Sequence, residues 1–177
     1  MTRSGPSTGR GHGNPLNLVD RSQFHLMLAV ETLKATRLQY CLSLLCLTPD
    51  VSHADARLMR WFARTACGAV RGFDVGTQLV PTCFSLLLID AEPGDMRGIV
   101  DRLVDAIDTC PRSISNPVSP FTLSVGASSY PKTVGNDADL LAQALGLMRK
   151  AWQDGGNRLY LPNGSSRSAK GQTPPSA

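Results

Sequence analysis

The chain has 177 residues, 42% of them hydrophobic, which favours one soluble domain with a substantial core. Its net charge of +4 suggests a nucleic-acid partner, but residues 1–13 and 163–177 together hold four of the 18 basic residues and no acidic ones. The remaining 14 basic residues equal the 14 acidic residues in number, so the body is near neutral and we expect no DNA partner.

Both ends of the chain are rich in Gly, Ser, Thr and Pro. Such segments bury too little apolar surface to offset the entropy of ordering them. We therefore expect disordered tails at residues 1–13 and 163–177 around one domain, residues 14–162. No apolar run resembles a secretory signal or reaches the length of a membrane span, so we expect a cytoplasmic protein without membrane insertion.

The cysteines are far apart or lie inside apolar runs, and no CxxC pair occurs. We expect buried free thiols, no disulfide, no metal site and no cofactor. The five are Cys41, Cys46, Cys67, Cys83 and Cys110.

The first predicted element is a helix over residues 20–39, which lack Gly and Pro and in which Asp20 can cap the start. The run QYCLSLLCLTPD follows, ended by Pro49, and its continuous apolar character predicts a central strand covered on both faces. A second helix is predicted over residues 55–71, with Gly72 as its stop.

Two short apolar runs, residues 75–80 and 84–90, predict a hairpin. The segment GDMRGIVDRLVDAIDTC has the apolar spacing of an amphipathic helix, and CPRSISNPVSP after it predicts a loop over residues 110–120. The alternation in FTLSVGASSYP then predicts a strand with one less apolar face.

The last predicted helix can be capped by Asp137 or Asp139. Its apolar residues recur at helical spacing and predict the buried side of the helix: Leu141, Leu145, Met148 and Trp152. RLYLP predicts a short closing strand. The alternation of helices and strands predicts an α/β fold in which helices pack on a mixed sheet.

Four stretches, in this order and spacing, are similar to motifs of one family: NPLNLVDRSQF, RGFDVGTQLVPTCFSLLLID, SVGASSYP and DADLLAQALGLMRKAWQDGGNRLYL. Together they resemble the GGDEF domains, the diguanylate cyclases that make cyclic di-GMP. The resemblance covers residues 14–161. It implies a mixed, mostly antiparallel central sheet flanked by helices, the ferredoxin-like palm of nucleotidyl cyclases.

The residues that cyclases need are substituted in this chain. The five letters of the family motif fall on Val80, Pro81, Thr82, Cys83 and Phe84, so the glycines, the metal-binding acid and the catalytic Glu are absent. Thr48 stands where the family has another metal-binding Asp, with Asp50 displaced nearby, and Trp152 and Gly156 replace two phosphate-binding cations. We therefore expect no cyclase activity.

The family's inhibitory site for cyclic di-GMP is the part of the pattern that survives. Arg71 and Asp74 keep the R-x-x-D spacing before the turn, and Arg102 falls where a second Arg completes that site, with Arg97 a weaker candidate. A guanidinium can donate to guanine O6 and N7, and a carboxylate can accept from N1–H and N2–H. The alternative is structural: an Arg that ends a helix, an exposed ion pair of Asp74, or a relic.

Cys83 has no His or Lys close in sequence that could lower its pKa, so we expect no thiol chemistry from it. Trp61 and Trp152 occur at helical core spacing and are predicted to pack in the core.

Two functions remain open at this point. The first is a catalytically inactive receptor that binds cyclic di-GMP through Arg71, Asp74 and Arg102 and regulates a protein partner in biofilm, exopolysaccharide, motility or virulence output. The second is a scaffold that keeps the fold and binds proteins independently of nucleotide. A homodimer is compatible with either.

Overall fold

The computed structural model describes residues 17–51, 55–109 and 122–167. Helices and strands alternate along these residues as the sequence predicts, with a short 3-10 helix, η1, leading into α3. In chain order the elements are α1 (Arg21–Leu38), β1 (Leu42–Pro49), α2 (Ala56–Gly68), β2 (Val75–Val80), β3 (Cys83–Ile89), η1 (Pro93–Asp95), α3 (Met96–Ile107), β4 (Leu123–Tyr130), α4 (Asp137–Gln153), β5 (Arg158–Leu161) and β6 (Gly164–Arg167).

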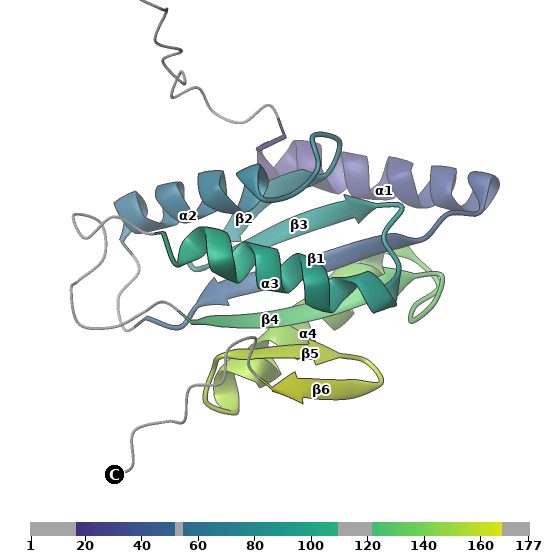
Figure 1. Ribbon diagram of the computed structural model, residues 1–177. Coiled ribbons are helices and arrows are strands. Elements are labelled where there is room, and N and C mark those ends of the chain that lie inside the picture. The colour runs from purple at the N-terminus through teal and green to yellow at the C-terminus, as the bar shows by residue number, and fades with distance from the viewer. Residues whose placement is uncertain (1–16, 52–54, 110–121, 168–177) are drawn as a thin grey trace, which may run out of the picture.

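The strands form one sheet in the order β2-β3-β1-β4-β5-β6 (Figure 1). Every neighbouring pair is antiparallel except β4 and β5, which are parallel. The predicted mixed, mostly antiparallel sheet is thereby confirmed, and β1 has β3 on one side and β4 on the other, as a central strand should.

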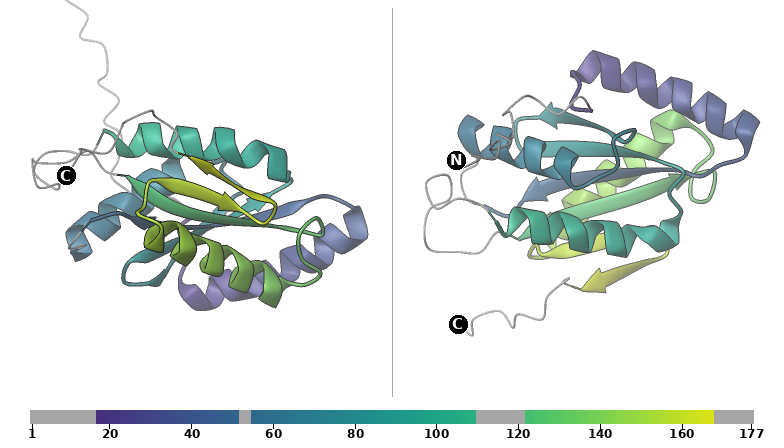
Figure 2. Two further views of the ribbon diagram at one scale, coloured as in Figure 1. Left: turned by 90° about the horizontal axis from the view of Figure 1, so that it is seen from below. Right: turned by 45° about the horizontal axis from the view of Figure 1, so that its top comes forward.

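The helices cover the sheet on both sides, α1 and α4 on one face and α2 and α3 on the other (Figure 2). Successive residues of β1 point to opposite faces: Leu44 joins the core under α1 and α4, and Leu45 joins the core under α2 and α3. All of β1 is buried, which confirms that this strand is covered on both faces.

The first residues of α1 and α4 are preceded by residues whose side chains cap the helix by accepting a backbone hydrogen bond. Asp20 accepts a hydrogen bond from the Gln23 N–H at 2.8 Å, as predicted for α1. The prediction for α4 was wrong, because Asn136 rather than Asp137 or Asp139 is its cap and accepts from the Asp139 N–H at 2.8 Å.

The end of α2 lies earlier than predicted. The helix stops at Gly68 rather than near Gly72, and residues 71–74 form a turn closed by the Asp74 N–H donating to the Arg71 carbonyl at 3.1 Å. Gly68 is the sequence signal that the prediction missed, because glycine weakens a helix, whereas Ala69 and Val70 after it do not break one.

The less apolar face of β4 is as buried as the other. A Cβ placed on Gly126 would lie 2.2 Å from the Ala144 carbonyl oxygen, so the backbone of α4 rests directly on the strand. The Ser128 hydroxyl donates to the Leu140 carbonyl at 2.5 Å. Small residues on this face therefore permit a close contact between helix and strand.

That contact also sets which side of α4 is buried. Leu140, Ala144, Met148 and Ala151 face the sheet. The predicted core residues Leu141 and Leu145 are only half-buried, and Trp152 is 60% exposed, so the prediction for Trp152 was wrong. Trp61, by contrast, is partly buried and packs against the core under α2 and α3.

The strand β6 lies in the segment predicted to be a disordered tail from residue 163 onward. It pairs antiparallel with β5, from Arg158 opposite Arg167 to Leu161 opposite Gly164. Backbone pairing builds this strand without an apolar pattern, so the tail prediction was wrong for residues 164–167. The predicted tail at residues 1–13, the loop at residues 110–120 and residues 168–177 lie outside the described residues.

Cys41, Cys46, Cys67 and Cys83 are free and buried, as expected, and Cys110 lies outside the described residues. In the part of the chain that the structure describes, no helix combines the length and apolar character needed to cross a membrane.

Candidate functional site

The structure brings the three predicted ligand residues to one place. Arg71, Asp74 and Arg102 line a cavity of about 290 Å³ between the turn after α2, the end of β3 and the start of α3. Arg97, the weaker candidate, is not among the residues that line it. Residues more than 25 positions apart in the sequence thus meet where a ligand could contact all three.

Asp74 is buried and held by the backbone. One carboxylate oxygen accepts from the Arg71 N–H at 2.9 Å and the other from the Ile89 N–H at 3.0 Å. Burial raises the pKa of Asp74 above its usual value, and these hydrogen bonds and the Arg71 and Arg102 charges partly oppose that rise. Because each carboxylate oxygen has a second lone pair, the fixed carboxylate can still accept from a ligand.

The predicted alternative of an exposed ion pair is wrong for Asp74, because the carboxylate is buried and bonds to backbone amides. A structural role for this residue is nevertheless real, since it ties the turn to the end of β3. Structural and ligand-binding roles are compatible here.

Arg71 donates a hydrogen bond to the Asp74 carboxylate through its backbone N–H. Its side chain takes no part in that bond and is exposed, so the guanidinium is available to a ligand. The guanidinium lies 5.8 Å from the centre of the Phe73 ring, which is itself 55% exposed. A flat guanidinium beside an exposed ring offers stacking surface to a planar base. Phe73 was not among the predicted ligand residues, and its only sequence signal is its place between Arg71 and Asp74.

Arg102 reaches the cavity from α3. Its guanidinium makes one long hydrogen bond, 3.4 Å, to the Gly98 carbonyl of the same helix. Gly94 and Gly98 line the cavity as well, and a Cβ on either would meet nothing within 4 Å. The missing side chains leave open space beside the two guanidiniums and the carboxylate.

The turn at residues 80–83, predicted to stand where GGDEF domains have their catalytic motif, lies at a second cleft, on the other side of the sheet. Thr48, Val80, Thr82 and Cys83 line this cleft of about 560 Å³. None of the described residues that line it carries a carboxylate. Phe84, expected to be a core residue, is fully buried.

Asp50, predicted to lie displaced near a metal-binding position of GGDEF domains, is held by three hydrogen bonds. It accepts hydrogen bonds from the Thr122 hydroxyl at 2.8 Å, the Ser124 hydroxyl at 2.5 Å and the Asn157 N–H at 2.7 Å. A Cβ on Gly156, which has φ of 75°, would lie 2.7 Å from the Asp50 carboxyl carbon. Gly156, predicted to stand where GGDEF domains have a phosphate-binding Arg, therefore makes room for Asp50 to hold β4 and β5 together.

Cys83 is buried, with its sulfur 3.6 Å from the Met148 sulfur. A hydrogen bond with Cys46 lowers the pKa of the Cys83 thiol, and burial opposes this effect. His25 of α1 lines the same cleft as Cys83, although the two residues are far apart in the sequence. Because the sulfur lies in the core under α1 and α4, it presents little surface to a substrate.

No known family model matches the chain, and neither does any curated protein. Solved structures do resemble it. The GGDEF domain of YfiN, also called TpbB, from Pseudomonas aeruginosa has a TM-score of 0.72 at 22% identity and covers 81% of this chain and 96% of that one.

Two further structures were solved with a bound molecule or protein. The GGDEF domain of DgcB from Caulobacter crescentus, in complex with cyclic di-GMP, has a TM-score of 0.66 at 14% identity and covers 90% of this chain and 98% of that one. The diguanylate cyclase SiaD from Pseudomonas aeruginosa, in complex with its activator SiaC, has a TM-score of 0.71 at 20% identity and covers 83% of this chain and 60% of that one. This chain therefore has the GGDEF-domain fold, as the sequence motifs indicate.

Proposed function

We propose that this chain, which has the fold of GGDEF domains, is a receptor for cyclic di-GMP that makes none itself and regulates a protein partner. The observation that carries the proposal is the meeting of Arg71, Asp74 and Arg102 around one cavity. The complex of DgcB with cyclic di-GMP supports the ligand class, and the complex of SiaD with SiaC supports a protein partner.

The chemistry of the cavity suits one guanine and an adjacent phosphate. Asp74 accepts from guanine N1–H and N2–H, while Arg71 and Arg102 donate to O6 and N7 or to the phosphate. Phe73 extends the stacking surface next to Arg71. The proposal places one of the two guanines of cyclic di-GMP in this cavity.

The absence of cyclase activity is part of the proposal. Val80, Pro81 and Thr82 form the turn where metal and triphosphate would be held, and Pro81 has no N–H to donate to a phosphate. Among the described residues, no three His, Cys, Asp or Glu side chains are grouped so as to hold a metal ion. We expect incubation with GTP and Mg²⁺ or Mn²⁺ to give no cyclic di-GMP, and product formation lost on changing Thr82 would contradict this.

Calorimetric titration with cyclic di-GMP tests the receptor. Arg102→Ala and Arg71→Ala each remove a charged donor without touching the core, so each is expected to weaken binding about tenfold or more. Arg97→Ala is the matched control, because it removes the same charge from an exposed position on α3 that does not line the cavity. Equal affinities for Arg97→Ala and Arg102→Ala, or no heat with the wild type, would reject the site.

A second variant tests the cavity by filling it. Gly98→Leu places a side chain where nothing lies within 4 Å, and it replaces a helix-weakening residue in α3. We expect a protein at least as stable as the wild type that no longer binds cyclic di-GMP. A stable Gly98→Leu protein with unchanged affinity would mean that the ligand binds elsewhere.

The second candidate function, a scaffold independent of nucleotide, is favoured by the outer face of α1. Leu26 and Leu33 are 66% and 72% exposed, and they lie on the side of the helix opposite its buried residues. Exposed apolar side chains on one helix face are typical of protein contact surfaces. Recovery of the same partner with and without cyclic di-GMP, and its loss in Leu26→Gln, would support the scaffold over the receptor.

A further inference from the structure

The cleft beside the turn at residues 80–83 is large enough for a small organic ligand. Its volume of about 560 Å³ falls within the roughly 300–1,000 Å³ typical of ligand pockets. It is lined by the first turns of α1, the end of β1, the β2–β3 hairpin and α4 from Leu141 to Trp152. It opens on the face of the sheet that α1 and α4 cover, whereas the cavity of Arg71, Asp74 and Arg102 belongs to the opposite face.

The walls of the cleft are mostly apolar. Leu79 and Val80 line it from β2, and Leu145 and Trp152 line it from α4. Val80 is 48% exposed and Trp152 is 60% exposed, so both large side chains are in contact with water when nothing covers them. Covering this surface with an apolar ligand would be favourable, because it removes apolar area from water.

The charged residues that line the cleft are all basic. Arg21 enters from the first turn of α1, Arg149 from α4, and His25 lies one helical turn after Arg21. No acidic residue is found in the described lining, and neither Arg forms an ion pair with any described residue.

We propose that this cleft binds an amphipathic organic carboxylate, with its apolar body against Trp152 and Leu145 and its carboxylate paired with Arg149 and Arg21. A guanidinium matches a carboxylate through two parallel hydrogen bonds. The same lining disfavours a metal-bound triphosphate. The described residues of the lining supply no carboxylate to hold the metal, and most of the lining is apolar. This site is independent of the cyclic di-GMP site proposed above.

The test uses dodecanoate as a probe below its critical micelle concentration. The chain contains two Trp, so Trp61→Phe leaves Trp152 as the only Trp reporter of the cleft. We expect saturable binding with a blue shift of Trp152 emission, because the ligand would exclude water from a ring that is now 60% exposed. Arg149→Gln should weaken this binding about tenfold or more.

The matched control is Lys150→Gln, which removes one positive charge at the next position of α4. Lys150 points to the Tyr160 ring, with its ammonium 5.6 Å from the ring centre, and does not line the cleft. Dodecanol, which has the same chain without the charge, should bind more weakly than dodecanoate.

Several results would overturn the proposal. They are a signal that appears only with micelles, equal losses in Arg149→Gln and Lys150→Gln, or equal affinity for dodecanol and dodecanoate. Saturation with cyclic di-GMP should leave dodecanoate binding unchanged, so failure of one site is distinguishable from failure of the other.

Discussion

The Asp74 carboxylate has a structural role, and a ligand-binding role is proposed for it. It caps the turn that follows α2 and anchors that turn to β3 through the backbone amides of Arg71 and Ile89. The same contacts fix the orientation in which the carboxylate would meet the proposed ligand. A position that is rigid before binding loses less entropy when a ligand arrives.

The raised pKa of Asp74 predicts opposite pH trends for folding and binding. A carboxyl that holds its proton more tightly when folded stabilises the folded state at low pH, and that contribution is lost as the pH rises through the folded pKa. Guanine N–H groups need the ionised acceptor, so affinity for cyclic di-GMP should instead fall on acidification.

Comparison with Asp74→Asn isolates this group, because the other carboxyls titrate in both proteins. As the pH falls from about 7 to about 4, the wild type should gain stability relative to Asp74→Asn in urea unfolding. Over the same range its affinity for cyclic di-GMP should drop. A stability difference that is constant with pH would contradict the pKa shift.

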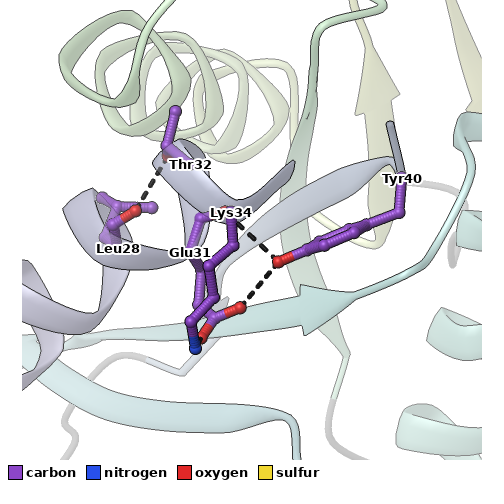
Figure 3. A network of polar contacts seen from close by, with 5 residues as sticks. All are labelled: Leu28, Glu31, Thr32, Lys34 and Tyr40. Atoms are coloured by element: carbon purple, nitrogen blue, oxygen red, sulfur yellow. Dashed lines mark hydrogen bonds and ion pairs between the residues drawn. The ribbon is translucent and has the colours of Figure 1, made fainter. Parts of the chain in front are cut away.

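At the scale of elements, α1 is tied to the start of β1 by a small polar network (Figure 3). Glu31, although buried, accepts from the Lys34 ammonium at 2.6 Å and from the Tyr40 hydroxyl at 2.8 Å. Burial and then the hydrogen bond to Glu31 raise the pKa of Tyr40 to about 12. Glu31 is the only acidic residue of α1 and is buried, so the exposed side chains of this helix are apolar, basic or uncharged polar.

Removing the Tyr40 hydroxyl should loosen this junction. Tyr40→Phe leaves the buried Glu31 with Lys34, whose side chain is largely exposed, as its remaining side-chain partner, and we expect a loss of about 1 to 2 kcal/mol in the free energy of unfolding. Denaturant titration measures the loss. A Tyr40→Phe protein as stable as the wild type would show that the hydrogen bond to Glu31 contributes nothing.

Gly146 in α4 and Gly126 in β4, the strand that α4 contacts, predict opposite effects of substitution by Ala. Gly146→Ala lies in the helix with nothing within 4 Å of the added Cβ, so it should stabilise the fold by about 1 kcal/mol. Gly126→Ala places its Cβ 2.2 Å from the Ala144 carbonyl and should force α4 off β4, at about 2 kcal/mol or more. Melting temperatures that move in the same direction would refute the close contact.

For the whole molecule, apolar periodicity was sufficient to predict the order of elements and the burial of β1 on both faces. It was insufficient where backbone contacts decide the outcome. The close approach of α4 to Gly126 turned Trp152 outward, and β6 formed by pairing with β5 alone. Apolar patterns report which residues avoid water, but they do not report how near two backbones come.

Of the two candidate sites, one was predicted from the sequence and the other was not. The resemblance to GGDEF domains singled out Arg71, Asp74 and Arg102, and the fold does bring these residues together. The basic and apolar cleft was not predicted, because Arg21, Val80 and Arg149 come from three separate elements. Nothing in the sequence places those three residues next to one another before the sheet is assembled.

Truncation tests where the folded unit ends at its C-terminal side. A chain that ends at residue 162 keeps β5 but removes β6, exposing one edge of β5 and losing four paired positions. We expect it to lose about 2 kcal/mol in the free energy of unfolding compared with a chain that ends at residue 167. Hydrogen exchange should locate the loss at residues 158–161, since their amides would lie on an unprotected edge. Equal stability and equal exchange in the two chains would restore the boundary that the sequence predicted, at residue 162.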